Sequence, residues 1–200
     1  MDKYERRAFE CSVVELRVEE DGTKTVEGYA IKWDQFSVPL GWFYKFREKF
    51  KRGAFTDYLT ASTDTKFLVG HDINKVLGRR ANNTLELKED DVGLHFRAIL
   101  PKTTMGNDIH ELVKRGDVDK ISVGFSLVKE EWDETDENNP VRTVLKANLP
   151  EISLTAWPAY EQTEANARSI DPYKEYLESK TVKRSMKYYE NLIKLSEMED

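Results

Sequence analysis

The alternation of apolar and polar residues predicts a chain built mostly of short β-strands up to about residue 168. Asp21-Gly22 separates the first two strands and is a typical two-residue hairpin signal. So many short strands favour a closed or nearly closed antiparallel β-barrel, because closure leaves no strand edge exposed. The expected strands are Cys11–Glu20, Thr25–Trp33, Leu85–Lys88, Gly93–Leu100, Lys120–Val128, Arg142–Ala147 and Pro150–Trp157.

Two segments within this span have helical spacing instead. Gly53–Ala61 repeats its large apolar residues at intervals of three and four. Thr104–Arg115 carries Ile109 and Val113 on one face and stops at Gly116, a residue that commonly ends helices. The predicted fold class is therefore α+β and mainly β, with helices flanking the barrel.

The composition changes in two further segments. The stretch 129–140 (KEEWDETDENNP) has six acids against one Lys and predicts a solvated loop. From Asp171 to the end there is no Gly, and Pro172 stands at the expected start of a helix reaching about Ser196. We predict a barrel domain over 1–168 and a helical tail over 169–200, which docks on a partner or is processed. The tail has a narrow apolar stripe of Val182, Met186, Tyr189 and Ile193.

Composition and charge exclude several classes of function. The 200 residues are 39% hydrophobic and 34% charged, which is enough for a modest core. The net charge of -6 argues against a general nucleic-acid binder, so protein or peptide partners are expected. No apolar run approaches the roughly 18 residues that span a bilayer, and the first residues lead into no apolar signal core. A single cysteine, Cys11, excludes an intramolecular disulfide.

Two of the expected strands carry candidate chemistry on one face. Ser122, Gly124 and Ser126 alternate with apolar residues in one strand. Glu151 and Ser153 do the same in the other. If the two strands pair, Ser122 and Glu151 lie on the same side, and Gly124 leaves room for a substrate backbone. The alternative is an ordinary solvent-facing side of a sheet, which the pattern alone favours.

His71 is the candidate base. It follows the apolar run Phe67–Val69 and Gly70, at the expected end of a strand. A neutral imidazole there can take a proton from a serine hydroxyl and return it to a leaving amine. The alternative is a surface turn in which Asp72 starts a new element. His71, His95 and His110 lack the close spacing of a zinc site, and no phosphate-binding or Gly-x-Ser-x-Gly motif is present.

A series of short blocks resembles one known family. In this order and spacing they resemble the prohead proteases of tailed bacteriophages, a family related in fold to the herpesvirus assembly proteases. The likeness runs from about Val26 to Arg168. The blocks are Glu27–Ala30, Glu48–Phe55, Val69–Asp72, Leu77–Gly78, Asn83–Leu87, Gly93–Phe96, Leu100–Thr103, Ile121–Phe125, Pro150–Leu154 and Trp157–Tyr160.

The resemblance implies a serine endopeptidase with a catalytic triad. It assigns the nucleophile to Ser122 and the base to His71, the residues that the strand pattern also singles out. Glu151 is our choice for the third member, with His95 as the fallback, because the herpesvirus relatives use a second histidine. Asp72 is expected to point away from His71. Backbone groups after Trp157, and less directly Arg168, are candidates for the oxyanion hole.

The resemblance also implies where the protein acts and on what. It would cleave the scaffold segment of the major capsid protein, and itself, inside the immature phage capsid in the host cytoplasm. A homo-oligomer is possible, and neither nucleic acid, membrane, cofactor nor metal is expected. Two alternatives remain: a non-catalytic assembly factor of the same fold, and a plain β-barrel binding module.

Overall fold

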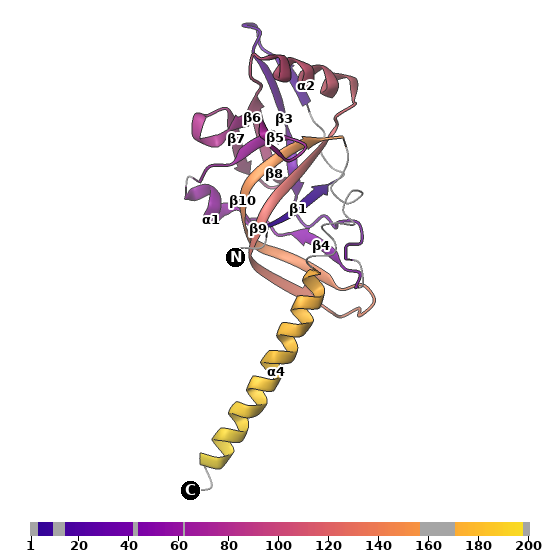
Figure 1. Cartoon of the computed structure of the whole chain (residues 1–200), viewed down its shortest axis with the longest axis vertical. Coiled ribbons are helices and arrows are strands. Elements are labelled where there is room, and N and C mark those ends of the chain that lie inside the picture. The colour runs from indigo at the N-terminus through magenta and orange to yellow at the C-terminus, as the bar shows by residue number, and fades with distance from the viewer. Residues whose placement is uncertain (1–3, 10–14, 42–43, 62, 157–170, 198–200) are drawn as a thin grey trace.

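The fold consists of two β-sheets with a few short helices and one long helix at the C-terminal end (Figure 1). The structure is a computed structural model and describes residues 4–9, 15–41, 44–61, 63–156 and 171–197. Within these residues the mainly β fold class predicted from the alternation is confirmed.

The first sheet is built around a long hairpin. Strands β9 (Lys120–Asp133) and β10 (Val141–Thr155) pair antiparallel along most of their length. The order of the sheet is β1-β9-β10-β5-β6, and β4 pairs with β10 beside this path. The remaining strands are β1 (Tyr4–Phe9), β4 (Arg47–Phe50), β5 (Lys66–Val69) and β6 (Asp72–Arg79).

The second sheet is a four-stranded antiparallel sheet in the order β2-β3-β8-β7. Its strands are β2 (Glu15–Val18), β3 (Lys24–Lys32), β8 (Gly93–Ile99) and β7 (Leu85–Glu89). The helices are α1 (Thr56–Thr60), the 3-10 turn η1 (Arg80–Asn82), α2 (Thr104–Arg115) and α4 (Pro172–Glu197). The predicted helix over Thr104–Arg115 is confirmed, and Gly116 ends it with a φ of 82°.

One apolar cluster joins the inner faces of both sheets. Phe67 of β5 and Phe96 of β8 lie with ring centroids 5.7 Å apart across the interface. Phe50 of β4 and Phe125 of β9 lie 5.1 Å apart, edge to face. All four rings are fully buried, so this cluster holds β5, β9 and β10 in fixed positions relative to one another.

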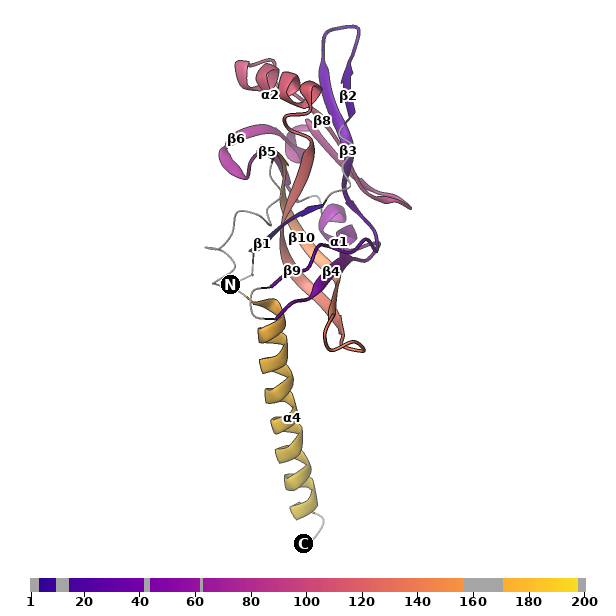
Figure 2. The ribbon, with the colours of Figure 1, turned by 90° about the vertical axis from the view of Figure 1, so that its right-hand side faces the viewer.

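The prediction of a closed or nearly closed antiparallel barrel is wrong. The described strands form two sheets, and the first curls only into a half-barrel (Figure 2). It is also mixed, because β10 takes β4 and β5 as parallel partners along two successive stretches. Parallel pairing joins segments distant in sequence, and local alternation carries no signal for it. A relation to the herpesvirus proteases stays a prediction.

The predicted solvated loop over 129–140 is too long. Lys129–Asp133 continues β9 and pairs with the start of β10, so the hairpin turns only after Asp133. Trp132 explains the extension, because its ring packs 5.1 Å from Phe46 and 5.0 Å from Tyr173. Burying this aromatic surface outweighs the acidic composition around it.

The predicted C-terminal helix begins at Pro172, and the contacts described between its side chains and the sheets lie in its first turns. Tyr173 is buried against Leu40 and Phe46. The hydroxyls of Tyr173 and Tyr176 donate to the Glu134 carboxylate at 3.1 and 3.2 Å. Farther along, Val182, Met186 and Tyr189 are exposed, and the helix projects away from the sheets (Figure 2). The side chain of Ile193, the last of the predicted stripe, lies outside the described residues.

The described part of the chain holds no helix both long enough and apolar enough to cross a membrane.

A buried ion network ties β1 to the rest of the first sheet. Arg142 of β10 is only 2% exposed and donates to both carboxylate oxygens of Glu5 at 2.8 Å. It also donates to Glu48 of β4 at 2.7 Å and to Glu130 of β9 at 2.5 Å. Arg7 of β1 donates to Glu48 at 2.8 Å and pairs with Glu5. Removing one member would leave the others buried with unpaired charge.

This network predicts acid-sensitive stability. Burial raises the pKa of Glu5, but Arg7 and Arg142 outweigh burial and lower it from 4.5 to about 2. Glu5 therefore stabilises the fold above pH 4.5, and this contribution is lost as the pH falls towards 2. Glu5→Gln should lower the free energy of unfolding by about 3 kcal/mol at pH 7. By pH 2 it should differ little from the wild type.

Denaturant titrations at a series of pH values check this, with Glu131→Gln as the control. Glu131 lies on β9 one residue from the network and is exposed. A constant difference between Glu5→Gln and the wild type across the whole pH range would contradict the role given to the Glu5 charge.

Candidate active site

The pairing of β9 with β10 places the serine and the glutamate on one face. Ser122 lies opposite Ser153, and Gly124 lies opposite Glu151. Residues opposite each other in an antiparallel pair point to the same side of the sheet. The expectation that Ser122 and Glu151 share a face is therefore confirmed.

A tight turn brings His71 over the same face. Gly70 and His71 both adopt the left-handed conformation, with φ values of 58° and 61°, between β5 and β6. This backbone is unfavourable for histidine and persists only where the surroundings hold it. Here β10 holds it, because Gly70 donates its N–H to the carbonyl of Leu154 at 2.8 Å. The His71 N–H in turn donates to Ser153 Oγ at 3.2 Å.

The three candidate residues form a continuous hydrogen-bonded chain. His71 Nε2 lies 2.8 Å from Ser122 Oγ, and His71 Nδ1 lies 2.6 Å from Glu151 Oε1. Ser122 has no exposed surface, and the His71 and Glu151 side chains are 11% and 8% exposed. This is the geometry of a nucleophile, a base and a carboxylate that orients the base.

The other residues weighed for the third position lie elsewhere. Asp72 turns away, accepting from the Asn74 N–H at 2.9 Å and pairing with Lys75. His95 is on β8 in the second sheet, with its ring 5.2 Å from Tyr29. His110 is buried on α2. The residues proposed for the oxyanion hole, after Trp157 and at Arg168, lie outside the described residues.

Two further residues contact the carboxylate and were not expected from the sequence. Ser153 Oγ donates to Glu151 Oε2 at 2.7 Å. The Tyr4 hydroxyl donates to Glu151 Oε1 at 2.6 Å. Ser153 was visible as a polar residue on the same face as Glu151. Tyr4 gave no signal, because nothing in the first residues predicts that they return to pair with β9.

These contacts set the charge of Glu151. Burial raises the pKa of this carboxyl, but the hydrogen bond and charge of His71 and the bonds from Tyr4 and Ser153 outweigh it. The net effect is a pKa below the usual range, so Glu151 is ionised at neutral pH. Burial and the adjacent Glu151 raise the pKa of Tyr4, which therefore stays a protonated donor. An ionised Glu151 can hold the Nδ1 proton of His71 and stabilise the imidazolium.

Gly124 is required by the crowding above it. A Cβ at this position would lie 1.9 Å from the Tyr4 hydroxyl oxygen and 2.3 Å from Glu151 Oε1. The space that the sequence suggested for a substrate backbone is therefore filled by these two side chains. Any larger residue at position 124 would push Glu151 away from His71.

Strand β1 lies beside Ser122. It pairs antiparallel with β9, with Ala8 opposite Ser122 and Arg7 opposite Val123. The carbonyl oxygen of Arg7 accepts a hydrogen bond from Ser122 Oγ at 3.0 Å. A serine hydroxyl has one proton, so Arg7 and His71 compete for it.

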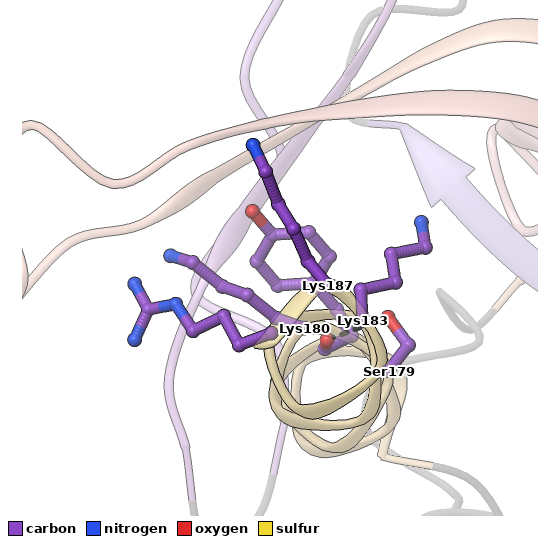
Figure 3. Close-up of a pocket in the computed structure, with 6 residues that line it drawn as sticks. Ser179, Lys180, Lys183 and Lys187 are labelled. Carbon is purple, nitrogen blue, oxygen red and sulfur yellow. Dashed lines mark hydrogen bonds between the residues drawn. The ribbon is translucent and has the colours of Figure 1, made fainter. Parts of the chain in front are cut away.

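One hollow on the described surface lies away from these residues, along the exposed part of α4 (Figure 3). It has a volume of about 280 Å³ and is bordered by a single helix, which makes it a shallow groove and not a substrate pocket. Its lining is strongly basic: Tyr176, Ser179, Lys180, Lys183, Arg184 and Lys187. In the described part of the chain, no group of three His, Cys, Asp or Glu residues is placed to hold a metal ion.

Comparison with known proteins adds two findings. The sequence profile of a family described as caudovirus prohead serine protease matches residues 12–176. Among solved structures, the capsid assembly protease of bacteriophage T4 matches with a TM-score of 0.53 and 8% sequence identity, covering 78% of this chain and 98% of that one. At this identity the likeness concerns the fold alone. A search of curated proteins gave no match.

Proposed function

Because the chain belongs to the caudovirus prohead serine protease family, we propose that it is an active serine endopeptidase of capsid maturation. The observation that carries the proposal is the hydrogen-bonded chain from Ser122 through His71 to Glu151. The proposed substrate is the scaffold segment of the major capsid protein, cut inside the immature capsid in the host cytoplasm. Cleavage of the enzyme itself is part of the same proposal.

The proposed mechanism uses the three residues in sequence. Ser122 Oγ attacks the scissile carbonyl carbon while His71 Nε2, 2.8 Å away, takes the hydroxyl proton. His71 then gives that proton to the leaving amine, which departs and leaves an acyl-enzyme. Water then attacks the acyl carbonyl carbon while His71 takes one of its protons. His71 returns that proton to Ser122 Oγ as the bond to the acyl group breaks and the acid product leaves.

Glu151 acts on the base and not on the substrate. Its bond to His71 Nδ1 fixes the tautomer that leaves Nε2 free to accept a proton. Its negative charge stabilises the imidazolium that forms during attack. Ser153 contributes by holding both the carboxylate and the His71 backbone, so one hydroxyl fixes two members of the triad.

A non-catalytic assembly factor is the second candidate. Two observations favour it: Ser122 has no exposed surface, and its hydroxyl donates a hydrogen bond to the Arg7 carbonyl. The argument against it is that Ser122, His71 and Glu151 form a complete hydrogen-bonded triad. Burying three polar side chains costs free energy, and a non-catalytic protein would gain no activity in return. A plain β-barrel binding module is no longer supported, because the described strands form two open sheets and no barrel.

The experiment that tests the proposal is cleavage of the capsid protein precursor by the purified protein. Cut sites are mapped by mass spectrometry, and an active-site serine probe reports whether Ser122 is reactive. Cuts that depend on Ser122 support a protease. Binding of the precursor without any cut supports the assembly factor.

The exposed part of α4 is the proposed docking element for capsid or scaffold partners. Its basic groove would receive an acidic segment of the partner, since Lys183 and Lys187 point outward along one face (Figure 3). We expect the double substitution Lys183→Glu and Lys187→Glu to lower incorporation into assembling capsids at least about tenfold. Cleavage of a short peptide should remain, because these residues lie on another element than the triad.

Co-assembly with capsid protein, followed by quantification of packaged enzyme, checks this expectation. The conservative pair Lys183→Arg and Lys187→Arg is the control, because it keeps the charge. Equal packaging of the charge-reversed protein and the wild type would exclude this face as the docking element.

A further inference from the structure

Strand β1 lies on the edge of β9 next to Ser122, where an extended target chain could also pair. Strand β9 has two edges, and β10 occupies one of them. An extended target chain that pairs with β9 must therefore use the other edge, where β1 now lies. On that edge a backbone carbonyl, that of Arg7, already reaches Ser122 Oγ. The chain's own first strand thus occupies the edge that such a target chain would need.

The side chains of β1 alternate between two environments. Arg6 is exposed on the face that carries Ser122 and Gly124, where its guanidinium lies 5.6 Å from the Tyr4 ring. Glu5 and Arg7 point the other way, into the buried ion network. The buried ion network beside the edge of β9 therefore binds every second side chain of the strand that pairs there.

That site has fixed charges independent of β1. Arg142, Glu48 and Glu130 come from three other strands, and Glu48 has no exposed surface. Arg142 holds the Glu5 carboxylate through two N–H groups, each at 2.8 Å. Glu48 holds the Arg7 guanidinium at 2.8 Å. Without β1, the site would offer a guanidinium for an acid and a carboxylate for a base.

Resting on the proposed function, we propose that β1 mimics a bound substrate. Its sequence then indicates which residues the enzyme prefers before the cut. Target chains pair with β9 as β1 does, and the cut falls directly after a basic residue held by Glu48. An acidic residue two positions before that basic residue is held by Arg142. The recognised pattern is acidic, any residue, basic, with the cut after the base.

The same placement makes β1 inhibitory. The Arg7 carbonyl oxygen accepts the Ser122 proton that His71 must take for attack. The ion pairs of Glu5 and Arg7 hold the strand in this unreactive position. A target chain must displace it, and weakening β1 should therefore raise activity on other substrates.

The first test uses full-length protein and synthetic peptides. The reference peptide has the sequence of β1, Tyr-Glu-Arg-Arg-Ala-Phe, and two partners replace its Glu by Gln or its second Arg by norleucine. Each replacement should lower kcat/KM about tenfold or more. In the enzyme, Arg7→Glu sets a like charge against Glu48 and should raise cleavage of the reference peptide about tenfold. Lys88→Glu, an exposed charge reversal on β7 of the second sheet, should leave the rate unchanged.

The second test assigns the preference to Glu48. Glu48→Gln should reduce the ratio of kcat/KM for arginine over norleucine towards one. A ratio within each variant is unaffected by any fraction of unfolded protein, so a loss of stability does not confuse the result. Glu131→Gln, exposed on β9, is the matched control and should keep the wild-type ratio.

The outcomes separate this inference from the proposed function. Cuts after uncharged residues, or a ratio unchanged by Glu48→Gln, would overturn substrate mimicry and leave a serine protease in place. Equal rates for Arg7→Glu and the wild type would overturn the inhibitory position of β1. Absence of both cleavage and probe labelling at Ser122, in the wild type and in an Arg7→Glu protein that thermal unfolding shows to be folded, would overturn the inference and the proposed function together.

Discussion

Ser122→Ala is expected to abolish cleavage of the capsid precursor while leaving the fold intact. The substitution removes the only atom at this position that can attack a carbonyl, and loss of a serine nucleophile typically costs about 10⁴- to 10⁶-fold in kcat. The structural loss is small, because Ser122 Oγ bonds only to His71 and the Arg7 carbonyl among the described contacts. A smaller side chain fits the same strand position without displacing β1 or β10.

Precursor cleavage followed by gel electrophoresis and mass spectrometry measures this effect, and thermal unfolding checks the fold. Ser126→Ala is the matched control, since Ser126 lies on the same face of β9, away from His71. We expect the control to cut at close to the wild-type rate. If the Ser122→Ala protein cuts as fast as the wild type, Ser122 is not the nucleophile.

Loss of His71 should be nearly as damaging, whereas loss of His95 or His110 should be mild. Only His71 contacts both Ser122 and Glu151, and a serine without its base is a poor nucleophile at neutral pH. His95 and His110 belong to other parts of the fold. Serine and histidine act as one unit, so the double variant with Ser122→Ala should be little worse than either single variant.

The choice of substitution at position 71 matters because the backbone there is left-handed, with a φ of 61°. Alanine is strained in this conformation, and a folding defect would imitate a catalytic one. Asparagine tolerates it and has no basic nitrogen, so His71→Asn should keep the thermal stability and still lose the activity. Comparable losses of activity from substitutions at all three histidines would contradict the assignment of the base.

The sequence predicted the placement of Ser122, His71 and Glu151 better than it predicted the fold around them, and their catalytic roles stay a prediction. Alternation has a fixed period of two, so the shared face of Ser122 and Glu151 followed once their strands paired. His71 was expected at the end of a strand next to Gly70, and it lies directly after β5; the alternative that Asp72 starts a new element also holds, because β6 begins there. Both inferences needed only neighbouring residues.

What the sequence did not predict depends on contacts between distant segments. Strands β4 and β5 join β10 in parallel, and β1 crosses from the start of the chain to β9. The bond from Tyr4 to Glu151 and the ion pairs of Arg142 follow from those pairings. Apolar burial of Trp132 likewise overrode the acidic composition of the β9–β10 turn. No local pattern encodes which distant strand becomes a neighbour.

The helix α4 would also change the kinetics of any protease attached through it. Its 26 residues extend over about 39 Å, and its described contacts with the sheets lie in its first turns. An enzyme tethered through such a helix is confined to a small volume around its attachment point. Within that volume, the effective concentration of each neighbouring target bond is on the order of millimolar. Cutting would then be governed by which bonds lie within reach of the tether, so that a weak intrinsic affinity for each bond is sufficient.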